Sequence, residues 1–378
     1  MTVAIINPHY PPTICGVGDH TYHIVQTLLE AGIETYLICS ANQQPEPVEQ
    51  PHIYPIIDKW NRQGFQTALD KLATIKPDWV LVQYVPHGYH PKGLPFAILG
   101  FYKTLTRRNY QILTIFHEVC VRSGHKLSTR FISAAEVYIA RKLTKQSTKI
   151  ATSIDFYADI LRGPQKKLNI NIVPIGSGIT PIYTPLEVKK ALRIQYNIPE
   201  KSTIIVTFGN RDVDVYLPDF DKLATEFPNF IWLLCGKNST SADVIRSRSY
   251  IRHTGEMSAA NIYQALTLGN IAFLPEPVNA QMEGGSSNKS TALACVFSLG
   301  IPVIGVKGDM NNALLRDKEN ILLPNINEPD ALYESLKYCL DTEGSSEKLG
   351  RGATDLYETH LSWNVVGKQY LKLMMNDE

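Results

Sequence analysis

One short stretch, EGGSSNKS at residues 283–290, has the composition of an anion-binding loop. Its two glycines let the backbone approach a ligand, and its lysine and four hydroxyl or amide side chains can donate hydrogen bonds to phosphate oxygens. It is not a Walker A loop, because Asn288 stands where that motif requires glycine before the lysine. The residues expected to bind a diphosphate here are Gly284, Gly285, Ser286, Ser287, Asn288, Lys289 and Ser290.

A helix is predicted directly after this stretch, over residues 291–299. Either Ser287 or Ser290 is suited to be its N-cap, which would leave free N–H groups at the positive end of the helix dipole. These groups would complete the diphosphate site. The alternative is a solvent-exposed, serine-rich turn that binds nothing.

A second glycine-bearing loop, CGVGDHT at residues 15–21, resembles the dinucleotide fingerprint GxGxxG but ends in Thr21. It also begins nine residues after Ile6, across a stretch that contains the proline pair at 11 and 12. A dinucleotide loop turns tightly off its strand, so this spacing argues against a dehydrogenase. Gly16, Val17 and Gly18 still suit a ligand at a helix N-terminus, and a plain strand–helix loop is the alternative.

Polar residues follow two further predicted strands. In FGNRD, at residues 208–212, Arg211 can neutralise a phosphate, with Gly209 and Asn210 beside it. In FHE, at residues 116–118, His117 and Glu118 end a strand where α/β proteins bind ligands. A surface arginine and a structural histidine are the alternatives.

These residues require elements that carry them to one edge of a sheet. Apolar runs rich in Val and Ile alternate with stretches of helical periodicity, such as residues 19–32 with Gly32 as a C′ residue. A first set of strands is predicted at 2–6, 34–39, 79–84, 110–116, 149–154 and 169–175. A second set is predicted at 202–209, 230–236, 250–255, 271–275 and 301–306.

The alternation predicts an α/β protein with two Rossmann-like, doubly wound domains that face a cleft. A Gly- and Pro-bearing linker at 175–188 would join them. The length of 378 residues also favours two domains. The tail at 353–375 is predicted to be helical, with an apolar stripe formed by Leu361, Trp363, Val366, Tyr370 and Leu373.

The composition, 44% hydrophobic and 19% charged, is that of an ordinary soluble protein. No run of 18 apolar residues predicts a membrane span, and the N-terminus indicates a first strand instead of a signal peptide. The six cysteines form no CxxC pair, so we expect buried, reduced thiols and no zinc or other metal site. Together these features predict a cytoplasmic protein.

The net charge of +1 is unevenly distributed. Residues 1–180 carry +6 and residues 181–378 carry −5, with the basic residues concentrated between 103 and 167. One interpretation is ordinary solvated helix faces. The other is a surface for an anionic partner, such as lipid headgroups at the inner membrane surface or an acidic acceptor. No nucleic-acid recognition module is evident.

Taken in order, these segments resemble the GT-B fold glycosyltransferases of the retaining family four group. The resemblance runs the length of the chain: YPPTICGVGDHTYHIVQTLLEAGIETYLI resembles the family's opening, NIVPIGSGITPIYTP its interdomain linker and ALACVFSLGIPVIGVKGD its LEAMA.G.PVI segment. It implies an N-terminal domain at 1–178, with a terminal helix at 357–378 packing back on it, and a nucleotide-sugar-binding domain at 179–356.

The resemblance also assigns roles. Gly16, Val17 and Gly18 would contact the donor phosphate or the acceptor, and His117 would hydrogen-bond the donor sugar. Gly209 and Arg211 would face the diphosphate, and residues 284–290 would wrap the diphosphate and the sugar. The residues implied to line the nucleobase are Gly255, Glu256 and Met257.

Two departures from the family pattern concern charged residues. Ser287 and Cys295 occupy the positions of the family's Glu-x7-Glu pair, so both carboxylates are absent. Tyr216 replaces the lysine of an Arg-x4-Lys pair that begins at Arg211, and Lys289 could supply the missing charge.

The implied activity is transfer of a sugar from a nucleoside diphosphate, UDP or GDP, to a hydroxyl of a glycan, a lipid-linked or a small-molecule acceptor. It would need no metal or further cofactor and would proceed with retention, in glycan, polysaccharide or glycolipid biosynthesis. Arg211 and Lys289 would stabilise the leaving diphosphate, whereas an inverting enzyme would use His117 or Glu118 as a base. The alternatives are a catalytically reduced GT-B protein that binds a sugar nucleotide or glycan, and a GT-B epimerase or phosphorylase.

Overall fold

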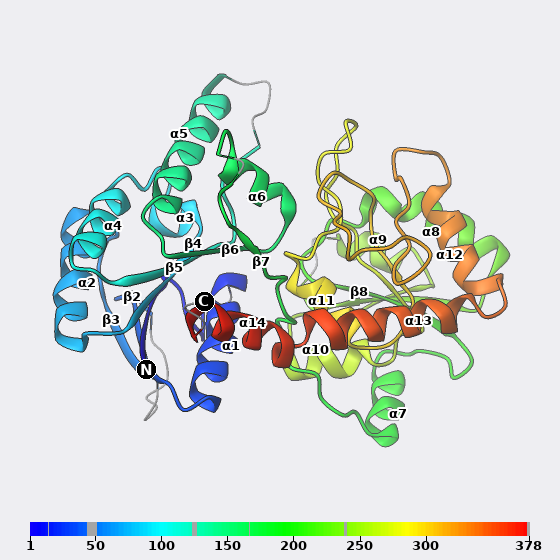
Figure 1. Cartoon of the computed structure of the whole chain (residues 1–378). Helices are drawn as coiled ribbons and strands as arrows, with labels where there is room; N and C mark the ends of the chain where they lie inside the picture. The colour runs from blue at the N-terminus through cyan, green and yellow to red at the C-terminus, as the bar shows by residue number, and fades with distance from the viewer. Residues whose placement is uncertain (14, 44–50, 123–126, 166, 238–239, 376–378) are drawn as a thin grey trace. The chain divides into compact units, whose positions relative to one another are not determined.

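The structure, a computed structural model, describes residues 1–13, 15–43, 51–122, 127–165, 167–237 and 240–375. The chain divides into two compact units (Figure 1). Unit 1 comprises Met1–Pro174 with Trp363–Glu378, and unit 2 comprises Ile175–Ser362. The first boundary lies before the expected residue 178 because the linker is already tied to unit 2, where the Ile175 N–H donates to the Asn288 carbonyl at 2.9 Å.

Unit 1 contains a seven-stranded sheet in which every pair of neighbouring strands is parallel. The strands are β1 (Thr2–Ile6), β2 (Glu34–Ser40), β3 (His52–Ile57), β4 (Trp79–Tyr84), β5 (Gln111–Phe116), β6 (Lys149–Thr152) and β7 (Asn171–Ile172). Their order, β3-β2-β1-β4-β5-β6-β7, is that of a Rossmann-like doubly wound sheet. The strand order reverses between β1 and β4.

Strand β3 is missing from the sequence-based prediction. It contains Pro55, which cannot donate a backbone hydrogen bond. Proline is nevertheless tolerated at the edge of a sheet, and β3 is the edge strand beside β2. The tertiary position of this segment therefore overrides its weak local signal.

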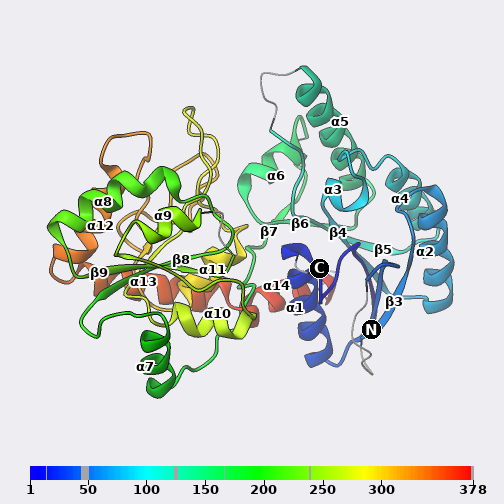
Figure 2. The same ribbon diagram turned by 180° about the vertical axis from the view of Figure 1, so that it is seen from behind.

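Helices cover both faces of the unit 1 sheet (Figure 1, Figure 2). The helices are α1 (Gly16–Glu30), α2 (Arg62–Ile75), α3 (Pro86–Tyr89), α4 (Ala97–Arg107), α5 (Leu127–Thr144), α6 (Asp155–Arg162) and α14 (Trp363–Met375). Helices α1 and α14 pack side by side on one face, where Ile24, Val366 and Tyr370 join the buried strand residues. Helices α2, α4 and α5 lie on the other face.

Unit 2 contains a five-stranded parallel sheet. The strands are β8 (Thr203–Phe208), β9 (Phe230–Cys235), β10 (Ile251–His253), β11 (Ile271–Phe273) and β12 (Val303–Ile304). Their order, β10-β9-β8-β11-β12, repeats the first five positions of the unit 1 sheet, and it reverses between β8 and β11. The predicted fold class, two Rossmann-like α/β domains, is confirmed.

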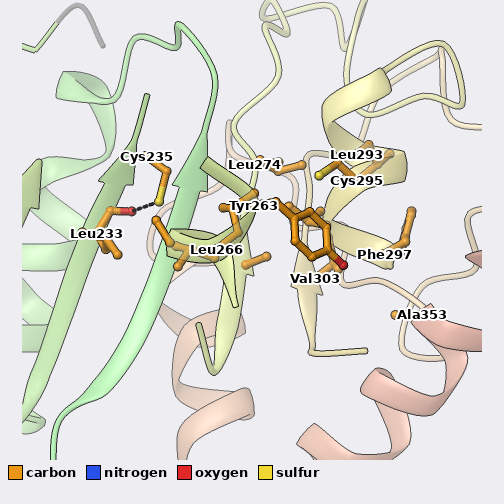
Figure 3. Close-up of a cluster of buried hydrophobic side chains, with 14 of the residues drawn as sticks. Leu233, Cys235, Tyr263, Leu266, Leu274, Leu293, Cys295, Phe297, Val303 and Ala353 are labelled. Atoms are coloured by element: carbon orange, nitrogen blue, oxygen red, sulfur yellow. Dashed lines mark hydrogen bonds between the residues drawn. The ribbon is translucent and has the colours of Figure 1, made fainter. Parts of the chain in front are cut away.

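Two hydrophobic clusters fill the faces of the unit 2 sheet. The helices are α7 (Leu186–Gln195), α8 (Leu217–Glu226), α9 (Ala242–Arg246), α10 (Ala259–Leu266), α11 (Thr291–Phe297), α12 (Ala331–Asp341) and α13 (Ser345–Leu356). Helices α10, α11 and α13 form the cluster drawn in Figure 3. Helices α8 and α12 cover the opposite face, where Phe220 stacks on Trp232 with ring centroids 3.6 Å apart.

The predicted tail helix at 353–375 is not continuous. Helix α13 passes into a π-helical turn at Tyr357–Leu361, the chain extends at Ser362, and α14 then begins. The predicted apolar stripe is therefore divided, because Leu361 packs in the unit 2 core whereas Val366 and Tyr370 pack in unit 1. Residues 376–378 of the expected terminal segment lie outside the described residues.

All six cysteines are free thiols, and Cys39, Cys235, Cys295 and Cys339 are buried, as predicted. Among the described residues, no helix is both long and apolar enough to cross a membrane.

Candidate functional site

Each sheet has a point where its strand order reverses, and loops at the carboxyl ends of the flanking strands form the usual ligand crevice of such folds. In unit 1 the reversal separates β1 from β4, and the chain leaves β1 toward residues 16–18. In unit 2 it separates β8 from β11, and residues 209–211 follow β8 while residues 283–290 follow β11. The fold therefore carries most of the predicted site residues to the two reversal points.

In unit 1, Asn7 fixes the start of helix α1. It follows β1 directly, is fully buried, and its Nδ2 donates to the His9 carbonyl at 2.6 Å and to Thr21 Oγ1 at 2.8 Å. The Thr21 hydroxyl donates in turn to the Val17 carbonyl at 2.8 Å. These bonds fasten the first turn of α1 to the end of β1, so the helix begins at Gly16 instead of near the expected residue 19.

The glycines of this turn have no evident role in the fold. Gly16 and Gly18 are helical, and neither has a positive φ. Among the described residues, a Cβ at Gly16 would meet nothing within 4 Å, and one at Gly18 would make only ordinary contacts of 3.6 Å. Glycine costs a helix up to about 1 kcal/mol relative to alanine, so local packing does not explain their presence.

His117 lies at the end of β5 as predicted, but it is buried beneath other side chains. Its Nε2 lies 2.5 Å from Gln83 Oε1, and its ring meets the ring of His20 edge-on with centroids 4.6 Å apart. Burial lowers the pKa of His117 to about 4, so the ring is neutral and donates from Nε2 to the amide oxygen. Glu118 is exposed to solvent.

Helix α14 contacts the two histidines of α1 that lie next to this site, His20 and His23. The side chain of His20 is almost completely buried, and its Nε2 lies 3.3 Å from the Tyr370 hydroxyl. Trp363 stacks on His23, one helical turn further along α1, with ring centroids 4.6 Å apart. The C-terminal segment therefore positions the histidine that contacts His117.

Four residues of this region are missing from the sequence-based site: Asn7, Asp19, His20 and Gln83. Asn7 and Gln83 lie at strand ends, the same signal that identified His117, and Asp19 and His20 lie within the CGVGDHT motif. Burial raises the pKa of Asp19 to about 6. The Oδ1 atom of Asn7 is buried and, among the described residues, has no hydrogen-bond partner.

In unit 2, Arg211 ties the end of β8 to the segment that follows β11. Its Nε donates to the Phe208 carbonyl at 2.9 Å and one terminal nitrogen donates to the Pro275 carbonyl at 2.6 Å. The other terminal nitrogen lies 3.0 Å from Glu276 Oε1, and both side chains are largely buried. Arg211 thus spans the reversal point of the sheet, and Glu276 balances its charge.

Residues 285–288 of the loop are buried and hydrogen-bonded within unit 2, so its serines do not form a solvent-exposed turn. Ser286 is fully buried, its N–H donates to the Val306 carbonyl at 2.9 Å, and its hydroxyl accepts the Val306 N–H at 2.9 Å. Asn288 donates to Asn312 Oδ1 at 2.9 Å, and its own Oδ1 is buried with no partner among the described residues.

The two glycines of this loop are required by the fold. Gly284 has φ of +116° and Gly285 has φ of +85°, both in the region that favours glycine. A Cβ at Gly284 would lie 2.1 Å from the Pro277 carbonyl oxygen, and one at Gly285 would lie 2.8 Å from the backbone of Gly308. Backbone conformation and close packing therefore explain both glycines, without the expected approach of a ligand.

Ser290 is the N-cap of helix α11, as one of the two predicted alternatives. Its hydroxyl oxygen accepts the Leu293 N–H at 3.2 Å and also lies 3.1 Å from Glu276 Oε1. Helix α11 ends at Phe297, earlier than the predicted residue 299. Lys289, immediately before the cap, is half-buried.

The predicted nucleobase residues follow β10. Gly255 has φ of +76° and forms an antiparallel bridge with Gly236, which follows β9. Glu256 is exposed, and Met257 packs partly against the core beside α10. Ser258 then caps α10 by accepting the Asn261 N–H at 3.3 Å.

The three residues that stand where the resembled family has charged groups are all buried. Cys295 is fully buried in the core near Leu293, and burial raises the pKa of its thiol to about 12 (Figure 3). Ser287 is 2% exposed. Tyr216 packs edge-on against Phe273, and burial raises its pKa to about 12. None of the three is an ionised group, and the charged side chains near them include Arg211, Glu276 and Lys289.

The part of the chain that the structure describes shows no group of three or more His, Cys, Asp or Glu side chains arranged to hold a metal ion. No protein-family model matches the sequence, and no curated protein matches it either.

Solved structures do match, over nearly the whole chain. Sucrose-phosphate synthase from Thermosynechococcus elongatus has a TM-score of 0.68 at 14% identity, covering 99% of this chain and 98% of its own. HepE from Anabaena in complex with UDP has a TM-score of 0.67 at 11% identity, covering 98% and 99%. The UDP-GlcNAc 2-epimerase from Neisseria meningitidis, bound to UDP-GlcNAc, has a TM-score of 0.60 at 13% identity, covering 99% and 100%.

The likeness extends through both units and both sheets, and it covers nearly all of each compared chain as well. It establishes that this chain has the GT-B fold, as its sequence predicted.

Proposed function

We propose that this protein is a glycosyltransferase that moves a sugar from a nucleoside diphosphate to an acceptor hydroxyl with retention of configuration. The observation that carries the proposal is the match, over nearly the full length of both chains, to structures that include a sucrose-phosphate synthase and a protein crystallised with UDP. Polar groups at the reversal points of both sheets support it. The other Rossmann-like function, nicotinamide chemistry, is disfavoured because residues 7–15 separate β1 from α1 without a tight glycine turn.

Unit 2 would hold the diphosphate. Negative charge grows on the departing diphosphate as its bond to the sugar breaks, and a preorganised donor stabilises such charge by about 3–4 kcal/mol. Glu276 already balances the charge of Arg211 at 3.0 Å. We assign cationic contacts to both Arg211 and Lys289, and Arg211 also places the ends of the two loops beside each other.

Unit 1 would position the sugar and the acceptor. With its pKa lowered to about 4 and its Nε2 bonded to Gln83, His117 is a poor general base at neutral pH. His117 is therefore not suited to be the base of an inverting reaction, and we keep the retaining reaction, in which the acceptor proton passes to the leaving phosphate oxygen on the same face of the sugar. His117 and the first turn of α1 would then bind and orient without taking that proton.

The test is a thermal-shift screen of UDP, GDP, ADP and their sugars, followed by NMR of the product anomer. A donor at about 100 times its dissociation constant adds about 2.7 kcal/mol of stability, which a melting curve detects. Lys289→Ala should abolish the shift from nucleoside diphosphates. The matched control is Lys201→Ala, which alters an exposed lysine just before β8. It lies at the amino end of that strand, whereas residues 283–290 follow the carboxyl end of β11. Equal shifts in both variants would remove Lys289 from the phosphate site.

A second candidate function is binding of a sugar nucleotide or glycan without transfer. Its support is the burial of Ser287 and Cys295, which leaves no carboxylate at the two positions where the resembled family carries one. Transfer to any acceptor, or slow hydrolysis of any sugar nucleotide, would exclude it. An epimerase, the activity named for one structural neighbour, would instead convert the free nucleotide sugar and release no nucleoside diphosphate.

A further inference from the structure

Helix α5 presents an apolar stripe to solvent. Three of its large hydrophobic side chains are exposed: Leu127 by 69%, Phe131 by 74% and Tyr138 by 52%. Their spacings of four and seven residues place them on one face of the helix, together with the exposed Ala134. The opposite face, with Ile139, Ala140 and Leu143, is buried in unit 1. The helix therefore already has a buried face that packs against the core, and the exposed stripe is a second, separate apolar surface.

Cationic side chains flank the stripe. Arg130 and Lys142 are exposed on α5, and Lys145 is exposed just beyond its end. The single acidic residue of α5, Glu136, is fully buried, and its Oε2 accepts the Val121 N–H at 2.7 Å. The solvent face of α5 thus carries positive charge with no negative charge of its own. We call these residues, Leu127, Arg130, Phe131, Ala134, Tyr138, Lys142 and Lys145, the α5 face.

A hollow of about 420 Å³ adjoins the carboxyl-terminal half of this face, between α5 and α6. Its lining includes Tyr138, Lys142 and Lys145, with Arg141 beside them and Arg162, which pairs with the exposed Asp159 at 2.9 Å. The Arg141 Nε donates to the Ile160 carbonyl at 2.8 Å, which fixes that guanidinium at the wall. The hollow is therefore a basic recess next to an exposed apolar stripe.

An exposed apolar stripe bordered by cations is the pattern of a helix that lies in the interface of an anionic bilayer. The apolar side chains enter the acyl boundary, and the cations meet phosphate groups at the level of the headgroups. A polyanion in solution would be attracted by the charges alone and would gain nothing from Phe131 or Leu127. Two further basic residues of this half of the chain, Lys126 and Lys166, lie outside the described residues.

We propose that the α5 face docks unit 1 onto an anionic phospholipid bilayer, with Phe131 and Leu127 inserted and the basic recess over lipid phosphates. The proposal rests on unit 1 alone and does not depend on the proposed sugar transfer.

The experiment is co-sedimentation of the full chain with vesicles of phosphatidylcholine, and with vesicles of an equimolar mixture of phosphatidylglycerol and phosphatidylcholine. We expect binding to the mixed vesicles that weakens with added salt, and little binding to phosphatidylcholine alone. Lys142→Glu with Lys145→Glu should weaken it by tenfold or more, since each cation near such a surface contributes about fivefold. The matched control is Lys103→Glu with Arg107→Glu, two exposed cations on α4 of the same unit.

The apolar arm separates insertion from simple charge attraction. Phe131→Ser should reduce binding severalfold, whereas Phe96→Ser, which alters a 51% exposed phenylalanine elsewhere in unit 1, should not. A gain-of-signal pair covers any variant that folds poorly: fluorescence of Phe131→Trp should shift to the blue on mixed vesicles, and that of Phe96→Trp should not.

Absence of binding to mixed vesicles overturns the proposal. Equal losses in the α5 and α4 charge pairs, or binding that is indifferent to Phe131→Ser, overturn it as well, because they describe attraction to any polyanion. Nucleotide-sugar binding, measured separately, is unaffected by any of these outcomes.

Discussion

The two glycine-bearing loops differ in why they contain glycine. In unit 2, Gly284 and Gly285 have positive φ and press against the Pro277 carbonyl and the Gly308 backbone. In unit 1, Gly16 and Gly18 have ordinary helical backbones, with no close neighbour among the described residues. The first pair is explained by the fold, and the second is not. Glycine is thus the stronger indication of a ligand at the loop where the fold has no use for it.

The two regions also differ in charge. The reversal point of unit 2 carries Arg211, Glu276 and Lys289, whereas that of unit 1 carries a buried, neutral layer of His20, Gln83 and His117. A charged diphosphate suits the first region, and uncharged hydroxyl groups suit the second. Four sets of variants test this difference between the two regions, and their expected effects on stability decrease in the order given below.

Gly284→Ala should destabilise the protein most. The new Cβ would lie 2.1 Å from the Pro277 carbonyl oxygen in a backbone with φ of +116°, so we expect a loss of about 3 kcal/mol or more. Denaturant unfolding measures it. Gly255→Ala is the control, because its φ is +76° but its Cβ would meet nothing within 4 Å among the described residues, and it should lose about 1–2 kcal/mol. Equal losses would show that close packing is not what requires Gly284.

Arg211→Ala should cost about 2 kcal/mol of unfolding free energy, since it removes the cationic partner of Glu276 and the hydrogen-bond donor to the Pro275 carbonyl. Arg248→Ala is the matched control in the same unit. Arg248 pairs with Asp221 at 2.8 Å, but both side chains are more exposed, so its loss should be nearer 1 kcal/mol. If Arg211→Ala leaves stability unchanged and removes only nucleotide binding, Arg211 is a direct phosphate ligand and not a brace.

Acid should destabilise unit 1 through His117. Its folded pKa of about 4 lies below its ordinary value of 6.5, so the unfolded chain binds the proton first and stability falls as pH drops between those values. From about pH 7 to about pH 5.5 this amounts to about 1 kcal/mol. His117→Gln should flatten the unfolding profile over that range.

The control for the acid effect is Asp19→Asn. The pKa of Asp19 is raised to about 6, so its protonation stabilises the folded state as pH falls and opposes the effect of His117. In Asp19→Asn, the unfolding free energy should therefore fall more steeply as the pH drops. A profile that neither variant changes would mean that other groups govern acid stability.

The smallest change in stability is expected for Gly16→Ala and Gly18→Ala. Neither new methyl group meets a close contact, so the unfolding free energy should hold or rise by up to about 1 kcal/mol. Affinity for the sugar nucleotide, by calorimetry, should nevertheless fall severalfold. A stabilised variant with full affinity would contradict the view that a ligand explains these glycines.

Much of this architecture is readable from local patterns. Short apolar runs located nearly every strand, Gly32 ends α1 at φ of +70°, and Ser290 caps α11. The strand that was missed, β3, has a proline that only an edge position tolerates. The helix at 353–375 was predicted as one piece because periodicity does not reveal where a helix passes from one core to another.

The sequence by itself determined the alternation of strands and helices, the loops at strand ends and the uncharged residues at positions 287 and 295. These follow from residue types at short spacing along the chain. Only the tertiary structure decided that Arg211 is held by Pro275 and Glu276, and that His117 lies under Gln83 and His20. Those partners are far apart in sequence, and strand order alone brings them together. Tertiary contacts also separate the two pairs of glycines: the fold requires Gly284 and Gly285, and it does not require Gly16 and Gly18.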